Sequence, residues 1–247
     1  PVKTYSIGFK GDVASSVYNE LPYARQVADR FGTDQHEIIV RPDVAKLLPK
    51  LIWHMDEPVA DSALVTTYLV SEFARRDVTV ILSGVGGDEL FGGYNRYLGD
   101  YYAGRYQLLP AWVRNAVISP LVQAMPSDRH GRISSLARYA RMFVASNDFP
   151  VEERYRSYVQ VFEREGLDRI LKSGQEGHVD SLDAAFAQVG SGDALNRLMR
   201  VDLMTQMPND LLMLTDKMTM AASLECRVPF LNHELVELAA RIPASLR

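Results

Sequence analysis

The feature that most constrains this chain is a glycine-rich loop, residues 83–89 (SGVGGDE), which continues directly into residues 90–94 (LFGGY). The loop follows residues 78–82 (VTVIL), an apolar and β-branched run that predicts a buried strand. Glycines permit backbone angles and close approaches that a Cβ atom would block. A strand that ends in such a loop delivers backbone amides and carboxylates to one point, so we expect a binding site there.

The loop combines groups that bind anions with groups that bind cations. Its candidate phosphate or carboxylate ligands are the hydroxyl of Ser83 and the amides of Gly84, Gly86 and Gly87. Asp88 and Glu89 add negative charge at the same place, which is favourable when a hard cation such as Mg²⁺ lies between acid and phosphate. A simpler alternative is a strand-to-helix turn in which the two acids stabilise the first turn of the next helix.

The complete string favours the first interpretation. Residues 83–94, with one variable position, are similar to the signature of the glutamine-hydrolysing asparagine synthetase family. The resemblance implies an adenine nucleotide α hydrolase-like fold, related to the pyrophosphatase-loop ATP enzymes, and an ATP-dependent amide-forming site. It also implies that the loop binds ATP, that Asp88 binds Mg²⁺ and that Asp88 and Glu89 are catalytic.

The segments before the loop alternate between strand and helix patterns. Four of them are residues 2–9 (strand), 19–31 (helix, stopped by Gly32), 35–40 (strand) and 42–54 (helix). Ser62 is the expected N-cap of a further helix that runs to about Arg76. The alternation predicts an α/β fold, in which helices flank a parallel sheet and ligands bind at the carboxyl ends of strands. The glycine loop lies at such an end.

The resemblance assigns further residues to the nucleotide and the substrate. Ile7, near the end of the first strand, is expected to contact the adenine base, which is compatible with an ordinary core strand. Asp61 and Ser62 belong to an acidic loop that resembles the family's substrate side, although N-capping explains both residues equally well. Tyr94 is expected either to close over the bound ligand or to pack in the core.

Residues 98–200 show helical periodicity without strand alternation. Two apolar stripes are expected to be core: Leu108, Trp112, Val113, Val117 and Leu121, and then Leu136, Tyr139, Ala140 and Phe143. The densest basic patch consists of Arg129, Arg132, Arg138 and Arg141. Because an acid and an apolar stripe accompany these arginines, we expect a solvated helix face rather than a nucleic-acid site.

The last segment carries a second resemblance. Residues 211–232 are similar to the family run D-K/R-x-S/T-M followed by S-L-E-x-R-V-P-F-L-D, with Asn232 in place of the usual Asp. Four charges stand in this apolar segment: Asp216, Lys217, Glu225 and Arg227. Buried charges must be paired, so we expect a network that supports the site, with direct substrate contact as the alternative. Cys226 is expected to be a buried structural thiol rather than a nucleophile.

The resemblance also predicts how the chain is organised. It implies an α/β nucleotide-binding part at residues 1–97, a helical part at 98–200 and a helical segment at 201–247 that returns to the site. Three family features are not found: the glutaminase domain with its N-terminal cysteine, the S-G-G-x-D-S pyrophosphate loop and a later lysine-containing run. The chain also begins at Pro1 in an expected strand. We therefore expect a fragment that is inactive alone.

Composition bears on the expected partners. The net charge of −4 gives no support for a nucleic-acid partner, and no run of about 18 apolar residues predicts a membrane span. The histidines lack zinc-ligand spacing. The single cysteine precludes an intrachain disulfide and fits a reducing cytoplasm. The sequence leaves a homo-oligomer open.

The resemblance implies a reaction in two steps. The side-chain carboxylate of aspartate attacks the α-phosphorus of ATP to give an acyl adenylate and pyrophosphate, and ammonia from glutamine then displaces AMP. Val85 stands where many family members have Glu or Asp, and valine cannot accept a proton from the attacking nitrogen. A related amide former, such as a β-lactam synthetase-like enzyme acting on another carboxylate, is therefore an alternative. A non-catalytic nucleotide-binding relative is a third, although Asp88 and Glu89 argue against it.

Overall fold

A computed structural model describes residues 1–9, 19–41, 43–57, 59–125, 132–162, 166, 169–170 and 180–246. The chain divides into two compact units. The first consists of Pro1–Val85 and Asn209–Pro229 with the short segment His130–Arg132, and the second of Gly86–Arg129, Ile133–Pro208 and Phe230–Arg247. The chain first passes from one unit to the other inside the glycine loop. The division into domains expected at residues 97 and 200 stays a prediction.

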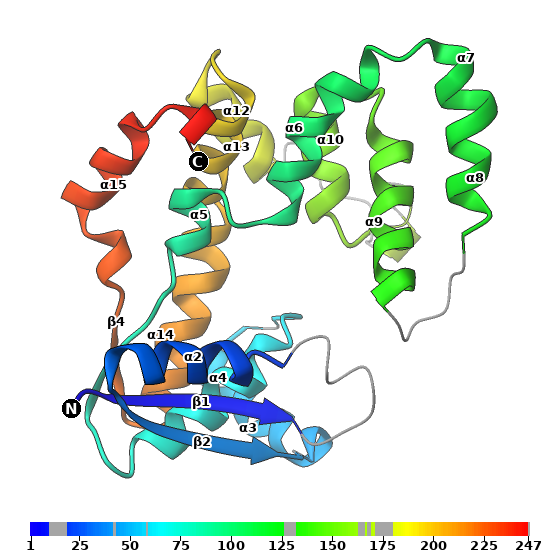
Figure 1. Ribbon diagram of the computed structural model, residues 1–247. Helices are drawn as coiled ribbons and strands as arrows, with labels where there is room; N and C mark the ends of the chain where they lie inside the picture. The colour runs from blue at the N-terminus through cyan, green and yellow to red at the C-terminus, as the bar shows by residue number, and fades with distance from the viewer. Residues whose placement is uncertain are drawn as a thin grey trace. The chain divides into compact units, whose positions relative to one another are not determined.

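The first unit contains two parallel pairs of strands (Figure 1). β1 (Lys3–Phe9) pairs with β2 (Asp34–Val40) in a register that sets Lys3 opposite Asp34. β3 (Val80–Leu82) pairs with β4 (Glu225–Arg227), with Val80 opposite Glu225. The predicted parallel pairing in an α/β fold is confirmed. The described residues, however, form two sheets of two strands rather than one continuous sheet.

The strands differ from the sequence-based expectation in burial and number. β3 is shorter than the buried strand expected at residues 78–82, and its Val80 and Leu82 side chains are 42% and 71% exposed. The first strand begins at Lys3, while Val2 is 72% exposed. β4 lies in a segment interpreted as helical, because its three residues are too few to show an alternating pattern.

Four helices complete the first unit: α2 (Leu21–Phe31), α3 (Val44–Met55), α4 (Ala63–Ala74) and α14 (Met213–Ala221). Gly32 ends α2 as predicted, since its φ of 63° is left-handed and its N–H donates to the carbonyl of Ala28. α2 and α4 contact β1, and α14 packs on α3 and α4. The core of this unit comprises Leu51, Met55, Leu64, Val65, Tyr68, Leu214 and Met218.

The start of α4 corrects one predicted contact. Ser62 occupies the N-cap position, but its side chain makes no capping hydrogen bond. Instead the carboxylate of Asp61 accepts from the N–H of Ala63 at 2.8 Å. Ser62 already has helical backbone angles, φ −66° and ψ −16°, whereas a capping side chain normally needs a non-helical residue. The cap is therefore supplied one residue earlier.

The regular secondary structure described in the second unit consists of helices. Its α-helices are α5 (Gly87–Phe91), α6 (Asn95–Gln107), α7 (Ala111–Val113), α8 (Ser119–Gln123), α9 (Arg132–Ser146), α10 (Val151–Val159), α12 (Ser181–Val189), α13 (Ala194–Met204) and α15 (His233–Arg241). Short π- or 3-10 turns are η1 (Arg114–Ile118), η2 (Met207–Leu212, which ends in the first unit), η3 (Pro229–Leu231) and η4 (Ala244–Leu246). The core contains Tyr97, Tyr155, Ala185, Phe186, Val189, Leu198, Met199 and Val201. None of the described helices is long and apolar enough to cross a membrane.

The two apolar stripes expected to be core are largely exposed. Leu108, Trp112 and Leu121 are 84%, 69% and 66% exposed, and in the second stripe Leu136 and Tyr139 are 64% and 50% exposed. The expectation was wrong because helical periodicity identifies an apolar face without showing that another element covers it. In the basic patch, Arg138 is exposed as expected for a solvated face, and Arg129 lies outside the described residues.

Candidate active site

The glycine loop begins with a short turn at the end of β3. The N–H of Ser83 donates to the carbonyl of Arg227 at 2.9 Å, which continues the pairing with β4. The hydroxyl oxygen of Ser83 then accepts from the N–H of Val85 at 3.3 Å. Ser83 thus stabilises its own turn, and its side chain also forms a hydrogen bond with the Cys226 thiol of β4.

Gly86 is the glycine of the loop that steric constraints require. Its φ of 99° is left-handed, and an added Cβ would lie 2.6 Å from the Cδ2 atom of Leu231. An added Cβ at Gly84 would meet no atom within 4 Å, and at Gly87 it would make only ordinary contact with Phe230. Gly86 therefore sets the path of the backbone into α5 and is itself buried, whereas Gly84 is exposed and Gly87 is partly exposed.

Asp88 lies on α5 with its carboxylate folded over Gly93. An added Cβ on Gly93 would overlap the Oδ1 atom of Asp88 and lie 2.8 Å from its Cγ. The N–H of Gly93 donates to the backbone carbonyl of Asp88 at 3.0 Å, and Gly92, with a φ of 73°, turns the chain back toward it. Because Asp88 remains exposed, its carboxylate can reach a ligand. Gly93 thus provides the space that this carboxylate occupies.

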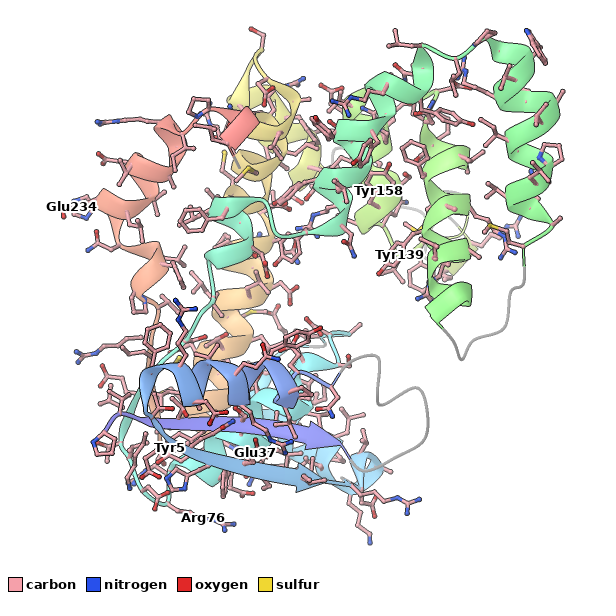
Figure 2. The ribbon with its side chains drawn as sticks, in the orientation of Figure 1. Tyr5, Glu37, Arg76, Tyr139, Tyr158 and Glu234 are labelled. Atoms are coloured by element: carbon pink, nitrogen blue, oxygen red, sulfur yellow. The ribbon has the colours of Figure 1, made fainter. Side chains whose placement is uncertain are left out.

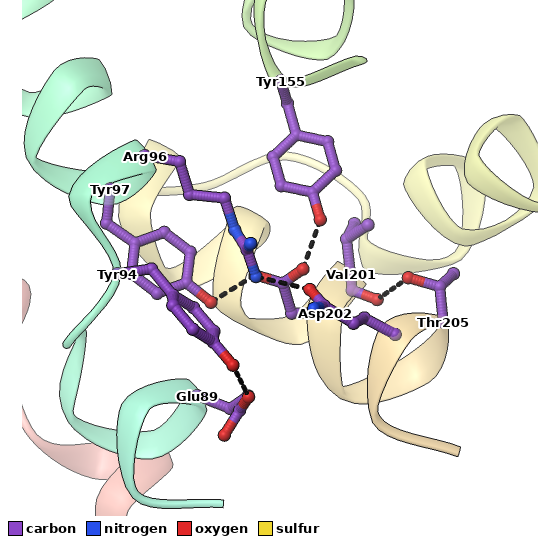
Figure 3. A network of polar contacts seen from close by, with 9 residues as sticks. Glu89, Tyr94, Arg96, Tyr97, Tyr155, Val201, Asp202 and Thr205 are labelled. Carbon is purple, nitrogen blue, oxygen red and sulfur yellow. Dashed lines mark hydrogen bonds and ion pairs between the residues drawn. The ribbon is translucent and has the colours of Figure 1, made fainter. Parts of the chain in front are cut away.

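Glu89, the next residue on α5, has a different environment. It is only 2% exposed, and its carboxylate accepts a hydrogen bond from the hydroxyl of Tyr94 (Figure 3). Burial, followed by the hydrogen bond to Glu89, raises the pKa of Tyr94, so this tyrosine stays protonated and donates. Asp88 and Glu89 are adjacent in sequence but differ in environment. Asp88 faces solvent, whereas Glu89 is buried and anchors α5.

A buried polar network lies next to Tyr94 (Figure 3). Asp202 on α13 is fully buried and accepts hydrogen bonds from the hydroxyls of Tyr97 and Tyr155. Arg96 forms an ion pair with the same carboxylate at 2.9 Å, and its guanidinium lies 3.9 Å from the ring centroid of Tyr94. The buried charges are thus paired and hydrogen-bonded, as burial demands.

This network could not be predicted from a sequence motif. Its partners come from α6, α10 and α13, so no contiguous motif contains them. One signal was present, because Asp202 shares the helical face of Leu198 and Val201, both of which are core residues. A charge on an apolar face of a helix indicates a buried partner.

Of the expected substrate-side residues, Asp61 and Ser62 belong to the first unit and Tyr94 to the second. Asp61 caps α4, as described above, and Ser62 is exposed. Asp210, which the sequence analysis did not single out, lies on η2, and partial burial together with the charge of Asp61 raises its pKa. An acid with a raised pKa is a candidate proton acceptor, so Asp210 joins Asp61 among the candidate residues. Ile7 is partly buried on β1 opposite Ile38.

Three of the four charges in the last segment take part in two separate ion pairs, one of them with Asp56 outside the segment, rather than in one buried network. Lys217 forms an ion pair with Asp56, which lowers the pKa of Asp56 through their hydrogen bond. Arg227 donates to Glu225 at 2.8 Å, and both side chains are more than half exposed. The expected burial is wrong because Glu225 and Arg227, two apart on β4, point to the same face. Their supporting role, like that of the exposed Asp216, stays a prediction.

Two further expectations concern the thiol of Cys226 and a bound metal ion. Burial raises the pKa of the half-buried Cys226 thiol, as expected for an unreactive cysteine. Within the described part of the chain, no group of three or more His, Cys, Asp or Glu side chains is arranged to hold a metal ion. Asp88 alone still fits Mg²⁺, because this ion commonly binds through one or two carboxylates together with substrate phosphates.

Comparison with known proteins covers the entire chain. The sequence model of the family described as asparagine synthase matches residues 1–247. An asparagine synthetase [glutamine-hydrolyzing] 1 of Bacillus subtilis (strain 168) is 32% identical over 249 residues, which cover 100% of this chain and 37% of the relative. A putative asparagine synthetase [glutamine-hydrolyzing] of Mycobacterium bovis is 33% identical over 247 residues, which cover 99% of this chain and 36% of the relative.

A relative with a different printed name also aligns over the full chain. It is amidase chry2 of Gibberella zeae, 24% identical over 271 residues, which cover 100% of this chain and 38% of the relative. The chain therefore spans only a little more than a third of the length of the curated relatives that it matches.

Proposed function

Since this chain belongs to the asparagine synthase family, we propose that it is part of an ATP-dependent carbon–nitrogen ligase that converts aspartate to asparagine with ammonia from glutamine. The fold of that family is adenine nucleotide α hydrolase-like. The observation that carries the proposal is the exposed Asp88 carboxylate, which occupies the space over Gly93 directly after the glycine loop. This arrangement suits a metal-bound phosphate.

The proposed reaction joins the groups of the loop to the chemistry of ATP. The Ser83 hydroxyl and the amides of Gly84, Gly86 and Gly87 bind phosphate oxygens, while Ile7 contacts the adenine base. The aspartate carboxylate attacks the α-phosphorus, pyrophosphate leaves, and ammonia then attacks the acyl adenylate and releases AMP. A Mg²⁺ ion held by Asp88 supplies positive charge to offset the charge that develops on pyrophosphate.

The remaining residues of the site act on orientation and proton transfer. Glu89 and Tyr94 hold α5, and hence Asp88, in place through their hydrogen bond. Asp61 and Ser62 lie on the side of the amino-acid substrate. Because Val85 cannot accept a proton from the attacking nitrogen, we propose that Asp210 does so, since its raised pKa favours proton uptake.

Exchange of labelled pyrophosphate into ATP by the intact parent protein, with and without aspartate, tests the proposal. We expect aspartate-dependent exchange that Asp88→Asn abolishes and that requires Mg²⁺. The isolated chain is expected to show no exchange. Absence of exchange with every carboxylic acid tested, combined with Mg²⁺-dependent ATP binding, would contradict catalysis and support a non-catalytic nucleotide-binding relative.

A second candidate function is amide formation on a carboxylate other than aspartate, as in a β-lactam synthetase-like enzyme. Val85 favours it, since the usual acid of the loop is replaced. A panel of carboxylic acids in the same exchange assay separates the two functions, because only the true acceptor supports exchange. For either function we propose small-molecule substrates, no nucleic-acid partner and a cytoplasmic location. Light scattering of the intact parent protein tests for a homo-oligomer.

A further inference from the structure

The second unit contains an open aromatic pocket that the proposed reaction does not use. Its volume is about 710 Å³, within the usual range of roughly 300–1,000 Å³ for small-molecule sites. Helices α6, α9 and α10 line it, and five of the lining residues carry aromatic rings: Tyr94, Tyr102, Tyr139, Phe143 and Tyr158. Tyr139 of α9 and Tyr158 of α10 lie in the space between those two helices (Figure 2).

Gly99 keeps one wall of the pocket open. It lies inside α6, where a glycine costs about 0.5–1 kcal/mol of stability relative to alanine. An added Cβ there would lie 3.4 Å from the hydroxyl oxygen of Tyr158, so any longer side chain would enter the pocket. Gly104 on the same helix faces open space within 4 Å. The two glycines therefore offer a matched pair for testing the pocket.

The rim of the pocket exposes apolar surface. Leu136 and Tyr139 on α9 and Leu98 on α6 are 64%, 50% and 53% exposed. Burial of such surface by a ligand is favourable, because apolar area removed from water contributes roughly 25 cal/mol per Å². An apolar ligand that enters the pocket would cover these residues.

The charges nearest the pocket are paired, because Arg96 of its lining pairs with Asp202 and Asp100 pairs with Arg154. Two further arginines lie beside it. The guanidinium of Arg105, which donates to the Tyr101 hydroxyl, lies 5.9 Å from the ring centroid of Tyr102, and that of Arg138 lies 5.9 Å from the ring centroid of Tyr139. Among the described residues, neither arginine forms an ion pair with a carboxylate. Two cations next to an aromatic pocket complement a ligand that is apolar in its body and negatively charged at one end.

We propose that this pocket binds a small molecule with an aromatic body and an anionic group. The site is independent of the proposed amide-forming reaction, since none of the residues that carry it is a ligand of ATP or Mg²⁺ in that proposal. Tyr94 also lines the pocket and donates to Glu89, so a bound molecule would touch a residue that holds α5.

Fluorescence titration of the full chain with two matched probes tests the proposal. The first probe, 1-anilinonaphthalene-8-sulfonate, has an aromatic body and a sulfonate, and the second, N-phenyl-1-naphthylamine, has the same body without the charge. We expect Gly99→Leu to weaken both probes at least about tenfold by filling the pocket, and Gly104→Leu to leave both unchanged. Replacing Arg105 and Arg138 by Gln together should weaken only the anionic probe, by about threefold to tenfold.

Controls keep the outcome independent of folding and of catalysis. Circular dichroism checks that each variant folds, and Ala140→Phe, which fills the pocket from α9, replaces Gly99→Leu if that variant does not fold. Equal probe affinity in the wild type and in both pocket-filling variants would overturn the site. An equal loss of affinity for both probes in the double arginine variant would contradict the proposal that the ligand carries an anionic group. Neither measurement depends on ATP or on an acceptor.

Discussion

At the scale of single residues, the contact between Gly93 and Asp88 gives the sharpest prediction. Gly93→Ala must displace the Asp88 carboxylate, because the new Cβ would overlap its Oδ1 atom. A displacement of this size commonly costs about 100-fold in rate when the displaced group positions a reacting ligand. We therefore expect pyrophosphate exchange by the parent protein to fall by about that factor in Gly93→Ala, with little change in thermal stability.

Gly104→Ala is the matched control for this prediction. It adds the same methyl group on α6, outside the candidate site, and its Cβ would meet no atom within 4 Å. Equal exchange rates in Gly104→Ala and Gly93→Ala would show that the Asp88 carboxylate is not held by the space over Gly93.

Asp210 gives a prediction about pH. Its pKa is raised above 3.8 in the folded chain, so the folded state holds the proton more tightly than the unfolded state does. The contribution of Asp210 to stability is therefore greatest at low pH and is lost as the pH rises through its raised pKa. Asp210→Asn removes this loss, and we expect a gain of less than about 1 kcal/mol at neutral pH, since solvent screens a partly exposed group.

Urea unfolding across the acidic to neutral range measures this effect. The unfolding free energy of Asp210→Asn relative to the wild type should increase as the pH rises from acidic to neutral. A difference between the two proteins that does not change with pH would contradict the raised pKa.

At the scale of helices and strands, the cap of α4 separates two neighbouring residues. Asp61→Ala removes the hydrogen bond to the Ala63 N–H and should lower the free energy of unfolding by about 1 kcal/mol. Ser62→Ala removes no capping bond and should change it by only a few tenths of that value. Urea denaturation of both variants measures the two losses in unfolding free energy. A larger loss in Ser62→Ala would support the prediction that Ser62 caps α4.

The network around Asp202 joins three helices, so its loss acts on α6, α10 and α13 together. Asp202→Asn would leave the Arg96 guanidinium buried beside a neutral group, and we expect a loss of about 3 kcal/mol in unfolding free energy. Glu225→Gln, which removes half of an exposed ion pair, should cost less than about 1 kcal/mol. Equal losses in the two variants, measured by urea denaturation, would contradict the importance of the buried pair.

Sequence patterns predicted elements better than they predicted what covers them. The end of α2 at Gly32 could be predicted, because a helix commonly ends at a glycine that adopts the left-handed backbone conformation. Trp112 and Leu136 belong to helical stripes, yet both are exposed, since the stripe records a face and not its partner. β4 escaped prediction because three residues carry no period, and its existence depends on β3.

At the scale of the whole molecule, the site could be predicted only where it is contiguous in sequence. Residues 83–94 carry the glycines and acids in one run, so their chemistry could be read directly. The contact of Gly93 with Asp88 and the ion pair of Arg96 with Asp202 depend on three-dimensional turns and distant segments. The variants described above therefore test the roles that we propose for residues of each unit.

The pairing of β3 with β4 has a consequence for how the protein is made. Val80 pairs with Glu225, so the partner strand leaves the ribosome long after β3 has emerged. At a translation rate of about 5–20 residues per second, the delay is on the order of ten seconds. During that interval β3 presents Leu82 and an unpaired edge to the cell, where other nascent chains can pair with it. Slower translation between the two strands should therefore lower the soluble yield.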